Sequence, residues 1–244
     1  MNSTAYGATS KRPAYRSLSG WITVATDRFA DAEPILESAG ARMLEVAGHD
    51  SVAYANNTYD RALLYRKLAR ERRASDAFAE SARIFEVTGG KDSVERGWSV
   101  WNYGRSALLL GEFAAAVTAI EEAESIFAHN SKLLTPARVN VWVNLVEAWL
   151  VGNQAQRALD AADDYLRQIR AAGMIERDAM ALLPALRSAA ATVLGDAQLA
   201  TSMRALALAE ADRVADDARD RSSLQRQIDR LSSLRPGMLV PPAN

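Results

Sequence analysis

Residues 98–127 read WSVWNYGRSALLLGEFAAAVTAIEEAESIF, and this stretch decides the fold. Two runs of apolar residues meet at a short break formed by the Leu-Gly-Glu sequence at 110–112. On each side of the break the apolar residues recur at i, i+3, i+4 and i+7, a spacing typical of amphipathic helices. Gly104 and Ala116 are small where the two helices would come closest. The stretch therefore predicts a helical hairpin with closely packed backbones.

The same hairpin recurs along the chain with a period of about 42 residues. Glycine and asparagine, which allow the left-handed backbone conformation that ends a helix, follow this period. They stand at the ends of hairpins (Gly48, Gly89, Asn130, Gly173) and between the two helices of a hairpin (Gly111, Gly152, Asn153, Gly195). Small residues in the second helix keep the same phase: Ala32, Ala74, Ala116, Ala158 and Ala200. Alanines placed by chance would not share one period with the residues that end the helices.

These signals predict an all-α chain. We expect first helices near 52–68, 93–109, 136–151 and 179–194, and second helices near 31–46, 72–88, 113–129, 155–172 and 197–214. Residues 12–26 are expected to form the first helix of an opening hairpin. The charged stretch 215–235 carries a narrow apolar stripe and predicts a capping helix, since a stack of repeats needs a polar-faced end. Residues 1–11 and 236–244 are expected to be a flexible N-terminus and a loose tail.

The hairpin resembles the tetratricopeptide repeat (TPR), a helix-turn-helix unit of about 34 residues. The longer period is similar to that of kinesin light chains and of some bacterial regulatory proteins. The resemblance covers about residues 12–214 and implies a right-handed TPR-like α-solenoid of about five hairpins, closed by the capping helix. It also implies a concave inner wall, lined by the first helix of each pair, that binds a peptide or a partner protein.

The family pattern places groove-facing side chains at set positions of each first helix. Asn102 and Asn144 share one position, 42 residues apart, and an amide there can both donate to and accept from a peptide backbone. Packing against a neighbouring helix is the alternative for these asparagines. The resemblance thus predicts a peptide- or protein-binding site formed by Asn56, Tyr59, Arg66, Lys67, Trp98, Trp101, Asn102, Arg105, Asn140 and Asn144.

Two other features have competing interpretations. Trp98 and Trp101 share a helix face and could anchor a partner, or they could pack between repeats. Arg61, Arg66, Lys67, Arg70, Arg72 and Arg73 make a basic cluster. This cluster could receive a carboxylate or a phosphate, or it could be a solvated helix end. Trp142 and Trp149 stand at positions that pack inside, so we expect them in the core.

The composition narrows the function classes. The chain has 244 residues, of which 49% are hydrophobic, and 29 basic against 30 acidic residues give a net charge of −1. We therefore expect no binding to nucleic acid or to an anionic membrane. Cysteine is absent, which fits a cytoplasmic protein, and no apolar run is long enough to span a membrane. His49 and His129 have no partner at ligand spacing, so no metal, cofactor or catalytic site is predicted.

The sequence therefore predicts a non-catalytic scaffold that binds a protein or peptide partner in its concave groove. Two other functions remain open: a peptide-sensing module of a bacterial regulator, and a structural subunit of a larger assembly. A regulator usually begins with a DNA-binding domain, and residues 1–26 are too short for one. The partner and the oligomeric state do not follow from the sequence.

Overall fold

The structure is a computed structural model that describes residues 29–131, 134–173, 177–215 and 218–239. The predicted flexible segment 1–11 and the predicted helix 12–26 lie outside the described residues, as do residues 240–244 of the predicted tail. The described ranges form ten helices and no strand. The all-α prediction is therefore confirmed.

The helices follow the predicted period closely, and among the nine first and second helices that the structure describes no predicted boundary is wrong by more than two residues. The first helices of the hairpins are α3 (Val52–Lys67), α5 (Val94–Leu109), α7 (Pro136–Val151) and α9 (Arg177–Val193). The second helices are α2 (Phe29–Ala47), α4 (Glu71–Gly89), α6 (Phe113–Asn130), α8 (Ala155–Ala171) and α10 (Ala197–Val214). The last helix is α11 (Ala218–Ser232).

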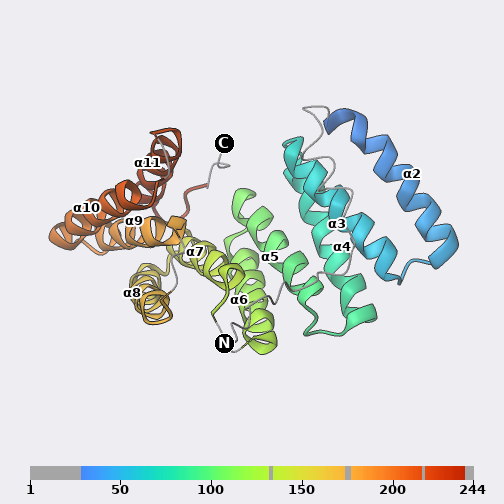
Figure 1. The fold of residues 1–244 in the computed structure, drawn as a ribbon, viewed down its shortest axis with the longest axis horizontal. Coiled ribbons are helices and arrows are strands. Elements are labelled where there is room, and N and C mark those ends of the chain that lie inside the picture. The colour runs from blue at the N-terminus through green and yellow to red at the C-terminus, as the bar shows by residue number, and fades with distance from the viewer. Residues whose placement is uncertain (1–28, 132–133, 174–176, 216–217, 240–244) are drawn as a thin grey trace, which may run out of the picture.

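Each helix packs against its neighbours in chain order, which makes an elongated array (Figure 1). The first helices also touch one another directly, α5 with α7 and α7 with α9. In Figure 1 the second helices α6 and α8 lie along one long side of the array, while α11 lies on the other side of α9 from α8. In the view of Figure 1, α6 and α8 therefore lie on the side of α7 and α9 that faces away from α11.

The small residues of the repeat lie at the helix–helix contacts. All five alanines at the 42-residue positions, from Ala32 to Ala200, are buried. A Cβ atom added to Gly104 would lie 2.6 Å from Ile120 Cγ1 and 3.3 Å from the carbonyl oxygen of Ala116. The backbones of α5 and α6 thus approach at the predicted pair, and the close approach requires glycine at this position. Trp142 and Trp149 are buried, as expected.

The turn between the two helices of a hairpin is the same in all four described hairpins. Its central residue has a positive φ: 56° at Ala69, 76° at Gly111, 64° at Asn153 and 84° at Gly195. The next residue donates its backbone N–H to a carbonyl five residues earlier, for example Arg70 to Tyr65 at 2.8 Å and Glu112 to Ala107 at 2.9 Å. Ala69 was not predicted as a turn residue because alanine rarely adopts this conformation.

The end of the chain folds back on the array. α11 packs on both α9 and α10, and its Leu224, Ile228 and Leu231 are buried in the main core together with Leu234. The residues after α11 then run back toward the end of α7, where the Gly237 N–H donates to the Val151 carbonyl at 2.8 Å. Figure 1 shows this segment leaving α11 and ending beside α5 and α7.

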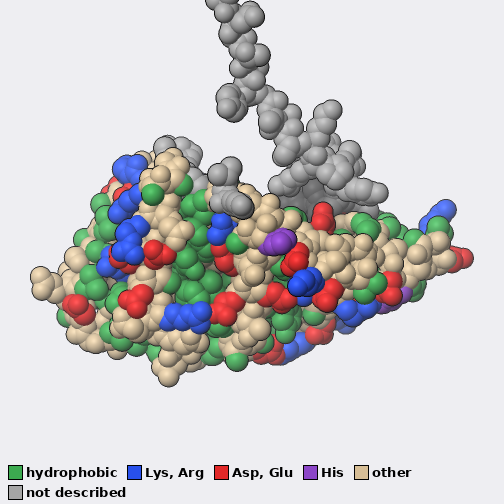
Figure 2. Space-filling model, turned by 90° about the horizontal axis from the view of Figure 1, so that it is seen from below, with side chains coloured by type: hydrophobic (Ala, Val, Ile, Leu, Met, Phe, Trp, Pro, Cys, Tyr) green, Lys and Arg blue, Asp and Glu red, His purple; other side chains and the backbone are tan. Residues whose placement is uncertain are grey.

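The exposed surface carries charges of both signs. Figure 2 shows basic and acidic side chains interspersed over the face that lies lowest in Figure 1. Such mixing agrees with the net charge of −1. Among the described helices, none has the length and apolar character needed to cross a membrane.

Candidate functional site

Polar and aromatic side chains connect the first helices of successive hairpins, and we call this surface the inner face. Asn102 of α5 lies at its centre and is buried. Its Nδ2 donates to the hydroxyl of Tyr59 at 2.9 Å and to the Trp98 carbonyl at 2.9 Å, and its Oδ1 accepts from Arg66 Nη1 at 2.7 Å. Asn102 therefore holds α3 and α5 together, and both of its amide donors are engaged.

Arg66 makes most of the remaining contacts between α3 and α5. Its Nη2 donates to the Asn102 carbonyl at 2.8 Å and to Ser106 Oγ at 3.0 Å, and its guanidinium lies 4.6 Å from the ring centre of Phe78. Burial lowers the pKa of Arg66 to about 10, and the nearby Arg105 adds to this effect. Burial also raises the pKa of the Tyr59 hydroxyl to about 12. The inner face is thus a poorly solvated environment for charge.

The next pair of first helices is joined by Trp101 and Asn144. Trp101 Nε1 donates to Asn144 Oδ1 at 3.1 Å. Both side chains are only partly buried, and no bond from Asn144 Nδ2 occurs within the described part of the chain. This amide can therefore still donate hydrogen bonds to another molecule.

Arg105 lies beside Trp101, with its guanidinium 5.2 Å from the indole ring centre. It forms no hydrogen bond or ion pair with any residue that the structure describes. Burial lowers the pKa of Arg105, while the carboxylates of Glu147 and Glu71 act in the opposite direction. A partly buried guanidinium without an ion pair is unfavourable, because it loses part of its hydration and gains no charged partner in return.

The inner face continues onto α7, where Glu147 is buried. Its Oε1 accepts from Arg230 Nη1 of α11 at 2.8 Å. Leu150 and Val151 of α7, and Leu182 and Leu186 of α9, are buried as well. The open part of the inner face therefore extends from α3 to the middle of α7, and the chain's own C-terminal residues cover the rest.

The other predicted site residues lie around this open part without joining its network. Asn56 is partly exposed and donates only to the Val52 carbonyl of its own helix at 2.9 Å. Lys67 and Asn140 are exposed. Trp98 packs against Trp101 and Phe127, with ring centres 5.3 and 5.0 Å apart. That packing between helices is the alternative that the sequence left open for Trp98.

The basic cluster does not form one surface. Arg70 and Arg73 both reach Glu33 of α2, at 2.6 and 3.5 Å. Arg72 points to the next hairpin and pairs with Glu112 at 2.6 Å. Arg61 donates to the hydroxyl of Tyr65, also on α3, at 3.1 Å. These four arginines therefore contact three different parts of the chain, whereas Arg66 belongs to the inner face.

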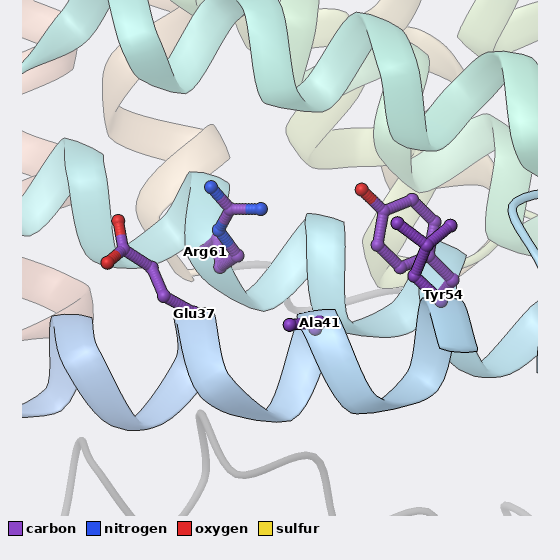
Figure 3. Close-up of a pocket in the computed structure, with 6 residues that line it drawn as sticks. Glu37, Ala41, Tyr54 and Arg61 are labelled. Carbon is purple, nitrogen blue, oxygen red and sulfur yellow. The ribbon is translucent and has the colours of Figure 1, made fainter. Parts of the chain in front are cut away.

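A separate pocket lies between α2 and α3. Figure 3 shows Glu37 and Ala41 projecting from α2, and Tyr54 and Arg61 from α3. The cavity of about 240 Å³ is open to solvent, and Glu37 and Ala41 are exposed. A cavity this open would bury little of a small ligand, so it is a poor candidate site.

Histidine and acidic residues do not gather into a metal site in the described ranges. His49 lies at the end of α2 and contacts Asp50 and Glu80 at 3.0 and 2.9 Å on an exposed surface. This contact and the Asp50–Arg83 pair at 3.1 Å lower the pKa of Asp50, the His49 contact most. The group is a surface ion network between hairpins.

Three contributors to the inner face, Ser106, Glu147 and Arg230, were not among the predicted site residues. Ser106 follows Asn102 by one helical turn, so its position on the same face could have been found from the period. Arg230 pairs with Glu147 across 83 residues. No spacing rule joins the end of α11 to α7, so this contact could not have been predicted.

Comparison with solved structures identifies the fold of this chain. No protein-family model matches the chain, and no curated protein matches it in sequence. Two crystal structures of a Podosopora anserina protein, described as a kinesin light chain with nearly identical TPR-like repeats, do match. One, a point variant, has a TM-score of 0.68 at 17% identity, covering 76% of this chain and 87% of that chain. The other has a TM-score of 0.67 at 16% identity and covers 78% and 90%. The chain is therefore a TPR-like α-solenoid.

Proposed function

We propose that the inner face of α3, α5 and the first part of α7 binds an extended segment of a protein partner, and that the chain is a non-catalytic scaffold. Folds of the TPR type generally serve as protein-interaction scaffolds, because stacked repeats present a long, preformed surface. A preformed surface lowers the entropy cost of ordering a bound segment. The cytoplasm is the proposed location, on the grounds given by the sequence.

The observation that carries the proposal is the state of Arg105. It is partly buried, lacks an ion pair among the described residues and lies against the Trp101 ring. Natural proteins keep such unfavourable groups mainly where function needs them. A carboxylate of the partner would satisfy the guanidinium with charge-assisted hydrogen bonds, and Trp101 would pack against the adjoining chain.

Asn144 provides the second part of the proposed site. Its Oδ1 is held by Trp101, so the orientation of its amide is fixed, and its Nδ2 is left to donate to a peptide carbonyl. Asn102 has a different role in the proposal. Because its amide already joins Tyr59, Trp98 and Arg66, it positions the helices that carry the contact residues. Asn56, Tyr59, Arg66, Lys67, Trp98 and Asn140 would flank or support the bound segment.

The proposal can be tested with Arg105→Met in the full-length chain. Peptides are first selected from a random peptide phage library on the unmodified protein, and their affinities are then measured by fluorescence anisotropy. We expect Arg105→Met and Trp101→Ala to weaken the selected peptides at least tenfold. Arg167→Met, the same change at an exposed position of α8, serves as the control and should leave the affinities unchanged.

Circular dichroism spectra and melting curves of all three variants separate loss of binding from loss of folding. Selected peptides that bind Arg105→Met and the unmodified protein equally would show that the inner face is not the binding surface.

A further inference from the structure

The last helix keeps the phase of the repeat. Gly237 follows Gly195 by 42 residues and also has a positive φ, of 74°. In the sequence, α11 therefore stands where the first helix of a sixth hairpin would stand. It ends at Ser232, however, and the chain then turns toward α7 instead of starting a second helix.

The apolar stripe of α11 lies on the side that other first helices turn to the inner face. Its buried residues Leu224, Ile228 and Leu231 follow Leu182, Leu186 and Ala189 of α9 by 42 residues. Conversely, Arg230 occupies the position of Gly104, where a second helix would have to pack. A long charged side chain there excludes the close contact that Gly104 permits. α11 therefore cannot start a further hairpin, and it buries its stripe against the array itself.

The residues from Arg230 to Leu239, which we call the C-terminal strap, follow α7 and reach α5. Arg230 pairs with the buried Glu147 at 2.8 Å, and Leu234 is fully buried. Farther along, the Gly237 N–H bonds to the Val151 carbonyl at 2.8 Å, and the Leu239 side chain lies against Gly111. An arginine and one backbone amide of the strap thus contact α7, and Leu234 is buried in the main core, to which α7 and α9 also contribute.

We propose that the second half of the inner face, on α7 and α9, is a binding site for a segment with an arginine and, four residues later, a leucine. The strap occupies this site in the free protein, and an external segment of the same chemistry exchanges with it. This inference extends the proposed function, since α7 belongs to both halves of the inner face. The chemistry of the site follows from Glu147, whose buried carboxylate requires a cationic partner.

Only the end of the strap, after Leu234, is loosely held, whereas Arg230 is part of α11 and Leu234 is fully buried. Beyond Leu234 the strap is held by one backbone hydrogen bond and the contact at Gly111, and Met238 and Leu239 remain 42% and 61% exposed. Glu147 also has a second cation nearby, because its carboxylate acts electrostatically on Arg105. If Arg230 is released, Glu147 therefore still has a positive charge nearby.

A tethered occupant has a high effective concentration and reduces the apparent affinity for any competing segment. The test uses a fluorescent synthetic peptide of residues Ile228–Leu239 as the probe. It is titrated against the unmodified chain and against the full-length variant Arg230→Gln/Gly237→Pro. Gln removes the charge that pairs with Glu147, and proline removes the N–H that bonds to Val151 and cannot adopt the positive φ of Gly237. We expect the variant to bind the probe at least tenfold more tightly than the unmodified chain.

Two controls make the result specific. The first control is Gly48→Pro, at the far end of the array. Gly48 also has a positive φ, of 78°, and its N–H also donates to a carbonyl, that of Leu44. This variant should bind the probe with the same affinity as the unmodified chain. A probe with Arg230→Glu should lose at least tenfold in affinity for the strap variant. If the double variant loses helicity, Gly237→Ala, which strains φ but keeps the N–H, replaces it in the same comparison.

Equal binding of the probe to the unmodified chain and to a folded strap variant, or no binding to either, would overturn the inference. Binding of the Glu-substituted probe at full affinity would do the same. The outcome is independent of the phage-selected peptides, because the probe assay varies neither Arg105 nor Trp101. Failure of the proposed function and failure of the strap site are therefore distinguishable.

Discussion

Arg66 and Asn102 are 36 residues apart and form two hydrogen bonds, one to the Asn102 side chain at 2.7 Å and one to its carbonyl at 2.8 Å. The same amide also bonds to Tyr59, so one asparagine joins two positions of α3 to α5. The repeat family would use this asparagine to bind a peptide. In this chain its hydrogen bonds join two helices of the scaffold instead. Its substitution therefore affects stability before it affects binding.

We expect Asn102→Ala to lower the free energy of unfolding by about 2–4 kcal/mol, because Arg66 and Tyr59 would each lose a buried partner. Asn144→Ala should cost less than about 1 kcal/mol, since its single side-chain bond is partly exposed. Urea unfolding followed by circular dichroism measures both values. Equal losses for the two variants would contradict the central position of Asn102.

We expect Ala69→Gly to stabilise the protein by about 1 kcal/mol, because glycine adopts a positive φ without the steric cost that alanine bears. The matched control is Ala79→Gly, at an exposed position inside α4, which should destabilise by about 1 kcal/mol through helix propensity. Thermal melts of the two variants should therefore shift in opposite directions. A lower melting temperature for Ala69→Gly would show that the turn is not strained.

Gly104→Ala should destabilise the protein by about 1–3 kcal/mol although alanine favours helices, because its Cβ would lie 2.6 Å from Ile120 Cγ1. Ser125→Ala, at an exposed position of α6, makes a comparably small change and should alter the stability by less than about 0.5 kcal/mol. Chemical denaturation gives both values. A stabilised Gly104→Ala would mean that α5 and α6 can separate at no cost.

Tyr59 should remain protonated far into the alkaline range, because burial raises its pKa to about 12. The folded state disfavours the phenolate, so the contribution of Tyr59 to stability is present below pH 10 and is lost as the pH rises toward 12. Ultraviolet difference titration of the folded protein should show a tyrosine ionisation near pH 12 that is missing in Tyr59→Phe. An unchanged titration in that variant would assign the ionisation to another tyrosine.

Arg105→Met should leave the stability unchanged or raise it by up to about 1 kcal/mol, because a side chain of similar length would fill the same space without a partly desolvated charge. Arg66→Met, in contrast, removes a guanidinium with several partners and should cost about 2–4 kcal/mol. Denaturation curves compare the two. A large loss for Arg105→Met would identify a structural role and weaken its assignment to partner binding.

The period of the sequence was sufficient to predict the helices, their order and the close contact at Gly104, because these depend on local patterns and on one repeated packing arrangement. The turn at Ala69 escaped prediction because its residue type gives no local signal. The positive φ at Ala69 is imposed by the packing of the two helices, and the turns at Gly111, Asn153 and Gly195 have the same conformation. Where one repeat lacks the usual turn residue, the backbone conformation is therefore better predicted from the equivalent positions of the other repeats than from the residue type.

The candidate site was harder to predict than the fold. The spacing of Asn102 and Asn144 placed both residues on the inner face, but it could not show that Asn102 is engaged by Arg66 and Tyr59 while Asn144 retains free donors. That difference depends on the side chains of the preceding first helix, which are not repeated. Whether these residues contact a partner remains a prediction.

Arg230 stands where the preceding first helices carry Ala62, Gly104, Val146 and Ser188, none of them long or charged, and this difference makes the array directional. New hairpins fused after Leu239 would find no open helix edge to stack on, whereas an extra 42-residue unit duplicated between Gly111 and Asn153 would meet a matching neighbour on each side. Modular lengthening of this protein, by evolution or by design, is therefore confined to insertions upstream of its last helix.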